Sequence, residues 1–171
     1  AGVAGSDVGA VCFYGAGCTA QRIPQMTAAL SETLGVTGAK VEVASDMLGA
    51  AVGVCGGEAG VVAILGTGSN SCLFDGNRIV ASTPALGYVL GDEGSGAALG
   101  KRVLCGVLKA TLPKAFCRDF LRDTRLTEAE VVERVYRGDS PNRFLASMAP
   151  HIIAHIDVAE VRQMVVDSFR E

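Results

Sequence analysis

Glycine is distributed unevenly along this chain. Of the 22 glycines, 20 lie in residues 1–100 and two in residues 101–171. Glycine tolerates backbone conformations that tight turns require, so the first part is predicted to contain strands and tight turns. The second part carries 12 of the 15 Lys and Arg residues, and it is predicted to form helices with charged surfaces. This change in composition near residue 100 predicts an α/β protein.

Composition excludes several classes of protein. The chain has 171 residues, of which 49% are hydrophobic, which is enough for a packed core and excludes disorder. Its formal net charge of −3 argues against non-specific nucleic-acid binding. No apolar run approaches the ~20 residues of a membrane helix, and no signal-peptide pattern is visible. We therefore expect a cytoplasmic protein with no membrane or nucleic-acid partner.

Cysteine and histidine are placed like packing residues. The cysteines lie inside apolar segments, form no CxxC pair, and are expected to be reduced thiols. His151 and His155 are the only histidines, so we expect no zinc site. Their four-residue spacing suits helix packing or the surface of a homodimer. The cysteines are Cys12, Cys18, Cys55, Cys72, Cys105 and Cys117.

Local patterns predict the secondary structure. Apolar runs predict strands, and apolar residues at helical spacing predict helices. Pro24 suits a first helical turn, Gly35 a helix end, and Thr127 with Glu130 a capping box. The expected strands are residues 8–14, 41–43 and 61–65, with a hairpin formed by 71–74 and 78–82. The expected helices are residues 23–34, 47–55, 97–112, 114–122, 127–137, 142–155 and 157–169, with Gly49, Ala50, Ala51 and Gly53 allowing close packing of the second.

A glycine-rich turn follows the buried strand 61–65. It consists of Gly66, Thr67, Gly68 and Ser69, and we call it the GTGS turn. Glycines let backbone N–H groups approach an anion, and the two hydroxyls are further donors. No lysine follows, so it is not a Walker A loop. An ordinary tight hairpin turn explains the same four residues equally well.

Acids at two helix starts are further candidates. Residues 91–96, here called the GDEGSG turn, place Asp92 and Glu93 between glycines before a predicted helix. Asp46 stands between an apolar strand and an apolar helix. Helix capping accounts for acids in such places. A carboxylate at the end of a strand can also act as a general base.

These three elements together resemble a known family. Their order is Asp46 with its small-residue helix, then ILGTGSNS at residues 64–71, then LGYVLGDEGSG at residues 86–96. The chain resembles the N-acetylglucosamine kinase and BadF/BadG-type ATPase family of the actin-like sugar kinase and Hsp70 superfamily. The resemblance covers residues 8–112, and more loosely the helices up to 171.

The resemblance implies a fold and a set of domains. Family members have two RNase H-like domains, each a mixed β-sheet with flanking helices, and ATP and sugar meet between them. Residues 1–57 would be part of the N-terminal domain, and residues 58–171 part of the C-terminal domain with a helical extension. The family's first phosphate loop and adenosine-binding segment are not found in this chain. We therefore expect an incomplete two-domain kinase that is inactive by itself.

The resemblance also implies roles for individual residues. Gly66, Thr67, Gly68 and Ser69 would approach the β- and γ-phosphates of ATP, with Mg²⁺ neutralising the phosphate charge. Asp46 would lie beside the sugar hydroxyl that receives the phosphate and act as general base. The sugar would also be bound by Ala85, Leu86 and Asp92. No metal-ligating residue is assigned.

The implied function is that of an ATP-dependent sugar kinase acting on the 6-hydroxyl of a hexosamine, with N-acetylglucosamine as the leading candidate. One alternative is a BadF-like ATPase that activates a partner reductase and shares an iron–sulfur cluster between two subunits. The six cysteines motivate that alternative, although none shows cluster-like spacing. Another is a non-catalytic sugar-binding regulator on the same scaffold.

Overall fold

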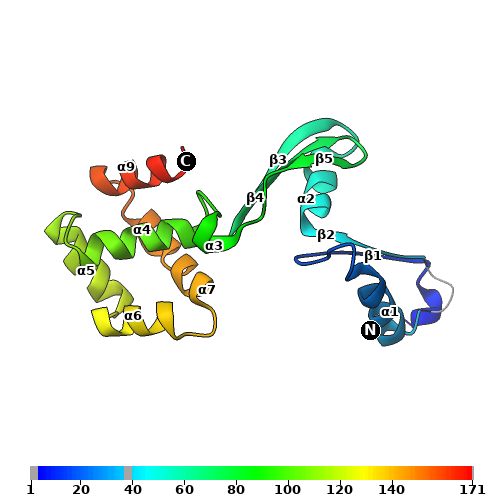
Figure 1. The fold of residues 1–171 in the computed structure, drawn as a ribbon, viewed down its shortest axis with the longest axis horizontal. Helices are drawn as coiled ribbons and strands as arrows, with labels where there is room; N and C mark the ends of the chain where they lie inside the picture. Colours follow the sequence, from blue (N-terminus) through cyan, green and yellow to red (C-terminus); the bar gives the residue numbers. More distant parts are fainter. Residues whose placement is uncertain (1–3, 37–39, 171) are drawn as a thin grey trace. The chain divides into compact units, whose positions relative to one another are not determined.

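Strands and helices are mixed as the glycine distribution predicts. A computed structural model describes residues 4–36 and 40–170 (Figure 1). The chain forms two compact units, Ala1–Ile64 with Ser71–Thr83, and Leu65–Asn70 with Pro84–Glu171. The expected boundary at residue 57 concerns the domains of a complete kinase, and it stays a prediction.

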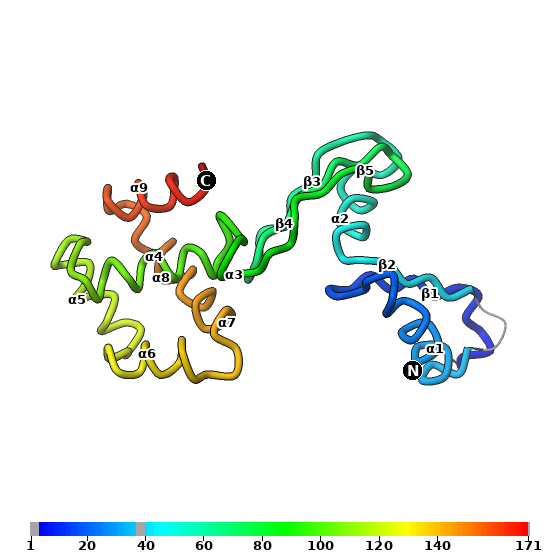
Figure 2. Tube along the Cα trace, in the orientation of Figure 1, coloured from blue at the N-terminus to red at the C-terminus, as the bar shows by residue number. Residues whose placement is uncertain are grey.

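Two small sheets organise the first part of the chain. β1 and β2 pair in parallel, with a register from Ala10 opposite Lys40 to Gly15 opposite Ser45. The other sheet has the order β3-β4-β5, and its strands can be followed along the tube in Figure 2. The elements up to Ser82 are a 3₁₀ turn (Gly5–Asp7), β1 (Ala10–Gly15), α1 (Ile23–Leu34), β2 (Lys40–Ser45), α2 (Asp46–Cys55), β3 (Ala59–Leu65), β4 (Ser69–Asp75) and β5 (Ile79–Ser82).

Turn and cap residues act as their positions predict. Pro24 lies in the first turn of α1, and Gly35 ends the helix with φ of 61°, a conformation that favours glycine. The predicted hairpin is confirmed, because β4 and β5 are antiparallel. Asp75 closes its turn by accepting hydrogen bonds from the N–H groups of Asn77 and Arg78.

The small residues of α2 allow close packing at some positions only. A side chain at Gly49 would lie 2.7 Å from Cβ of Tyr14 in β1, and Ala51 is fully buried. Gly53, in contrast, has no neighbour in the described part of the chain within 4 Å of a side chain built on it, so the packing role predicted for it is wrong. α2 contributes to a core that consists of Met47, Ala51, Val62, Cys72 and Phe74.

Helices α4 to α9 form the core of the second unit. Phe120, Ile152, Val103 and Val161 are among its fully buried side chains. His151 and His155 pack their rings edge-on against the phenylalanines of α5, which agrees with a packing role. The helices are α3 (Gly87–Leu90), α4 (Gly96–Leu108), α5 (Lys114–Thr124), α6 (Glu128–Tyr136), α7 (Pro141–Ala146), α8 (Ala149–Ala154) and α9 (Ala159–Ser168).

Two predicted helices need correction, and one short helix was not predicted. The expected helix 142–155 is broken into α7 and α8, because Pro150 has no N–H and in a continuous helix its ring would clash with the carbonyl of Ala146. The helix expected to reach residue 112 ends at Leu108, followed by Ala110 with φ of 52°. A short helix that the sequence patterns did not predict, α3, precedes the GDEGSG turn. No helix in residues 4–36 and 40–170 is long and apolar enough to span a membrane.

The capping box at the start of α6 is confirmed. The hydroxyl of Thr127 accepts the N–H of Glu130 at 3.3 Å, and the Glu130 carboxylate accepts the N–H of Thr127 at 2.8 Å. The Glu130 carboxylate accepts two hydrogen bonds from Thr127, one from its N–H and one from its hydroxyl at 2.7 Å, and these hold the pKa of Glu130 below its usual value. The charged carboxylate is therefore favoured by folding.

Replacing Thr127 with alanine tests this cap. Losing the cap should lower the melting temperature of the chain by about 2–4 °C at pH 7, while Thr127→Ser should stay near wild type. Because the pKa of Glu130 is lowered in the folded state, its contribution is present above the unfolded pKa and is lost as the pH falls through the folded pKa. The difference between Thr127→Ala and wild type should therefore shrink in acid. Melting curves followed by circular dichroism at several pH values would measure it, and a pH-independent difference would contradict it.

Candidate functional site

The GTGS turn and the GDEGSG turn contact each other directly, within the second unit. The N–H of Ser69 donates to Oδ1 of Asp92 at 3.1 Å. The hydroxyl of Ser69 donates to the carbonyl of Glu93 at 2.7 Å. Two motifs that lie more than 20 residues apart in sequence are thus brought together.

Helix α4 begins on the GTGS turn. The N–H groups of Gly96 and Ala97 donate to the carbonyls of Gly66 at 2.8 Å and Thr67 at 3.1 Å. Ser95, which is completely buried, caps the helix by accepting the N–H of Ala98 at 3.1 Å. The GTGS turn therefore satisfies donors that a helix start otherwise leaves unpaired.

Gly68 allows the Asp92 carboxylate to lie against the backbone. A side chain on residue 68 would lie 2.8 and 2.9 Å from the two Asp92 carboxylate oxygens, so a larger residue would displace the carboxylate. Asp92 itself has φ of 62°, in the left-handed region that few residues other than glycine adopt. Strained backbone of this kind is found preferentially at functional sites.

The GTGS turn retains donors that could meet an anion. Its own closing hydrogen bond runs from the N–H of Gly66 to the carbonyl of Gly68. The N–H groups of Thr67 and Gly68, and the exposed hydroxyl of Thr67, have no acceptor in the described part of the chain. Two successive free N–H groups in a turn form an anion-binding concavity. Ser69 differs, because its N–H and hydroxyl are both used within the protein.

Asp46 belongs to the first unit and is exposed. The cap of α2 is Ser45, whose hydroxyl accepts the N–H of Leu48 at 3.2 Å. Asp46 follows as the first helical residue, and among the residues that the structure describes its carboxylate accepts only the adjacent N–H of Met47, at 2.9 Å. The helix cap is therefore supplied mainly by Ser45, so capping explains little of why an aspartate stands at position 46.

The other predicted sugar contacts lie on the surface of the second unit. Ala85 and Leu86 are exposed, and they precede α3. Val89 and Leu90 of α3 are exposed too, and they line a pocket of about 380 Å³ beside the GDEGSG turn.

Two cations beside this turn were missed by the sequence analysis. Lys101 and Arg102 line the same pocket, together with Gly91, Glu93 and Ala98. They lie three and four residues after Ala98 on α4, a spacing that places residues on one helix face. Once the start of α4 was known, that spacing could have indicated that Lys101 and Arg102 lie beside the GDEGSG turn.

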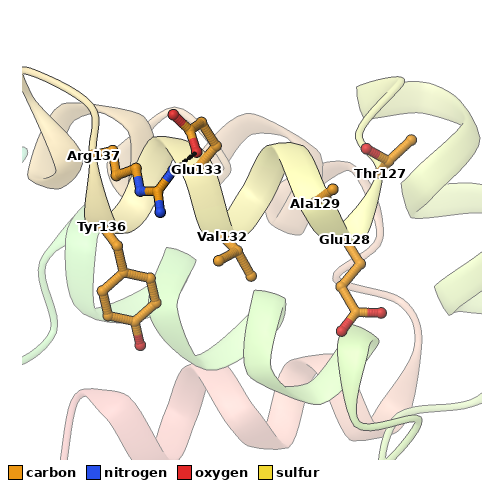
Figure 3. A pocket seen from close by; sticks show the side chains of 7 residues that line it. All are labelled: Thr127, Glu128, Ala129, Val132, Glu133, Tyr136 and Arg137. Carbon is orange, nitrogen blue, oxygen red and sulfur yellow. Dashed lines mark hydrogen bonds and ion pairs between the residues drawn. The ribbon is translucent and has the colours of Figure 1, made fainter.

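A further hollow lies over α6 (Figure 3). One end carries the ion pair between Arg137 and Glu133 at 3.4 Å, and Tyr136 is largely exposed there. Its lining residues are Thr127, Glu128, Ala129, Val132, Glu133, Tyr136 and Arg137. None of the predicted site residues takes part in it. Within residues 4–36 and 40–170, no group of three or more His, Cys, Asp or Glu residues is arranged to hold a metal ion.

Comparison with known proteins adds independent evidence. A Porphyromonas gingivalis structure, named as that of a candidate N-acetylglucosamine kinase, is 49% identical with a TM-score of 0.92. The match covers 96% of this chain and 58% of that one. A Chromobacterium violaceum structure with the same name is 22% identical, with a TM-score of 0.57 over 96% of this chain and 57% of that one, and shows a likeness of fold. No protein-family model and no curated protein matches the chain.

The chain belongs to the N-acetylglucosamine kinase and BadF/BadG-type family, as its motifs predicted. The predicted α/β class, with β-sheets and flanking helices, is also confirmed. It spans less than two thirds of the length of either structure.

Proposed function

We propose that this chain is part of an ATP-dependent sugar kinase that phosphorylates the 6-hydroxyl of a hexosamine, with N-acetylglucosamine as the leading candidate. The observation that carries the proposal is the direct contact between a turn with free N–H groups and a turn that presents the Asp92 carboxylate. The free N–H groups of the GTGS turn could bind a phosphate, and the Asp92 carboxylate of the GDEGSG turn could accept a sugar hydroxyl. The relationship to candidate N-acetylglucosamine kinases supports the same reaction class.

Each candidate residue has a separate role in the proposed phosphoryl transfer. The N–H groups of Thr67 and Gly68 and the Thr67 hydroxyl would donate to the transferred phosphate within the GTGS turn. Asp92 would accept a sugar hydroxyl, and Ala85 and Leu86 would contact the sugar. Asp46 would orient the 6-hydroxyl and take its proton.

ATP fits the donors that the GTGS turn leaves free, since neutral N–H groups without bulky side chains can approach phosphate oxygens closely. When bound with ATP, Mg²⁺ would supply positive charge to those oxygens. The first 100 residues contain few cations, namely Arg22, Lys40 and Arg78. The predicted dependence on a divalent cation follows from that shortage.

Further properties of the complete protein belong to the same proposal. They are the RNase H-like actin-type fold, with residues 1–57 and 58–171 contributing to its two domains, a cytoplasmic location, and a homodimer. A small-molecule sugar would be its principal partner. A size measurement in solution would test the dimer.

A coupled ADP-release assay with a panel of sugars tests the function. The complete protein should release ADP when N-acetylglucosamine or a related amino sugar is added, and Mg²⁺ removal should abolish that release. Mass spectrometry of the product should place the phosphate on the 6-hydroxyl. If folded complete protein responds to no amino sugar, the proposal is wrong.

Replacing Asp92 with asparagine tests its role in sugar binding. The amide keeps an oxygen for the Ser69 N–H and tolerates a positive φ, so the fold should be preserved. Losing the charged acceptor should raise the KM for the sugar by roughly tenfold or more, with a small change in kcat. Steady-state kinetics would measure this. A fall in kcat at constant KM would instead assign to Asp92 the role proposed for Asp46.

A further inference from the structure

Ser69 directs its donors at the neighbouring turn. Its hydroxyl has one proton to donate, and the acceptor is the Glu93 carbonyl at 2.7 Å. Its N–H is donated to Asp92 at 3.1 Å. Ser69 therefore has no remaining N–H or O–H to offer to a phosphate in this arrangement.

Thr67, in the same turn, behaves differently. Its side chain is exposed, and its hydroxyl has no partner among the residues that the structure describes. Within residues 4–36 and 40–170, only the carbonyl of Thr67 is engaged, by the N–H of Ala97 at 3.1 Å. The two hydroxyl residues of the GTGS turn are thus separable, one available to a ligand and one used inside the protein.

We propose that Ser69 is a positioning residue, which locks the GDEGSG turn onto the GTGS turn and is not itself a phosphate ligand. Asp92 adopts a left-handed conformation that needs support from its surroundings, and Ser69 contacts both Asp92 and the residue after it. Without the Ser69 hydroxyl, the Asp92 carboxylate is correctly placed in a smaller fraction of the molecules. The apparent affinity for the sugar falls in proportion to that fraction. The consequence for sugar binding rests on the function proposed above.

Two alanine variants of the complete protein make a matched pair, because each removes one hydroxyl from the same turn. Ser69→Ala should raise the KM for the amino sugar roughly two- to tenfold, the effect of one lost hydrogen bond, and leave the KM for ATP unchanged. Thr67→Ala should raise the KM for ATP and leave the sugar KM unchanged. In ligand-free protein, amide hydrogen exchange over residues 91–97 should become several-fold faster in Ser69→Ala only.

The outcomes separate this proposal from the proposed kinase function. If Ser69→Ala raises only the KM for ATP, Ser69 is a phosphate ligand and the positioning role is wrong. Faster exchange with both KM values unchanged also overturns it. If the wild-type protein turns over no amino sugar, the kinase proposal fails, and hydrogen exchange alone tests the positioning role. Faster exchange over residues 91–97 in Ser69→Ala then supports that role, and unchanged exchange overturns it.

Discussion

Asp46→Asn is expected to reduce kcat of the complete enzyme by about 10²–10⁴, with much of the sugar affinity preserved. Asparagine matches aspartate in size but cannot accept the proton of the attacking hydroxyl. The start of α2 should be unaffected, because Ser45 caps the helix and an amide oxygen can still accept the N–H of Met47. Steady-state kinetics with saturating sugar and ATP would measure the loss.

A second acid provides the control for Asp46. Glu58 is exposed in the same unit, and it has no role in the proposed chemistry, so Glu58→Gln should have wild-type kinetics. Ser45→Ala should lower the melting temperature by a few degrees through loss of the cap. If Asp46→Asn keeps full kcat with unchanged folding, Asp46 is not the base.

Gly100→Ala is expected to destabilise the protein by about 1–3 kcal/mol or more, against the usual preference of helices for alanine. A Cβ at Gly100 would overlap the backbone carbonyl of Leu145, where α4 meets α7. Backbone atoms cannot move aside as a flexible side chain does, so the two helices would have to separate. Chemical denaturation would measure the change in the free energy of unfolding.

Gly53→Ala is the matched control, because it makes the same substitution in a helix at a position where a Cβ would have no neighbour within 4 Å among the described residues. It should be neutral or stabilising by up to about 1 kcal/mol. A Gly100→Ala protein as stable as wild type would show that α4 and α7 do not approach this closely.

Much of the secondary structure follows from short-range signals. Pro24 and Gly35 delimit α1, Asp75 with its neighbours closes the β4–β5 hairpin, and Thr127 with Glu130 begins α6. Each signal acts within a few residues, so a single sequence contains it. The break at Pro150 is also local, but the apolar residues on both sides of it led to the prediction of one continuous helix.

The arrangement of the candidate site could be predicted only in part. Both glycine-rich turns were identified from sequence, but the hydrogen bonds from Ser69 to the GDEGSG turn join residues 23 and 24 positions apart. No local pattern specifies such a pairing, because it depends on how α4 starts against the GTGS turn. For the same reason, the different surroundings of Gly49 and Gly53 could not be read from the small-residue pattern of α2.

The exposure of the segment around Leu86 has a consequence for how specificity could diverge in this family. Leu86, Val89 and Leu90 are 56%, 68% and 73% exposed, whereas Gly68 is closely packed against the Asp92 carboxylate. Substitutions at these three exposed residues meet few packing constraints, so many would be compatible with folding. Changes in the GTGS turn, in contrast, disturb both turns at once. Under the proposed function, substitutions at Leu86, Val89 and Leu90 could therefore change the preferred acceptor sugar while the GTGS turn remained unchanged.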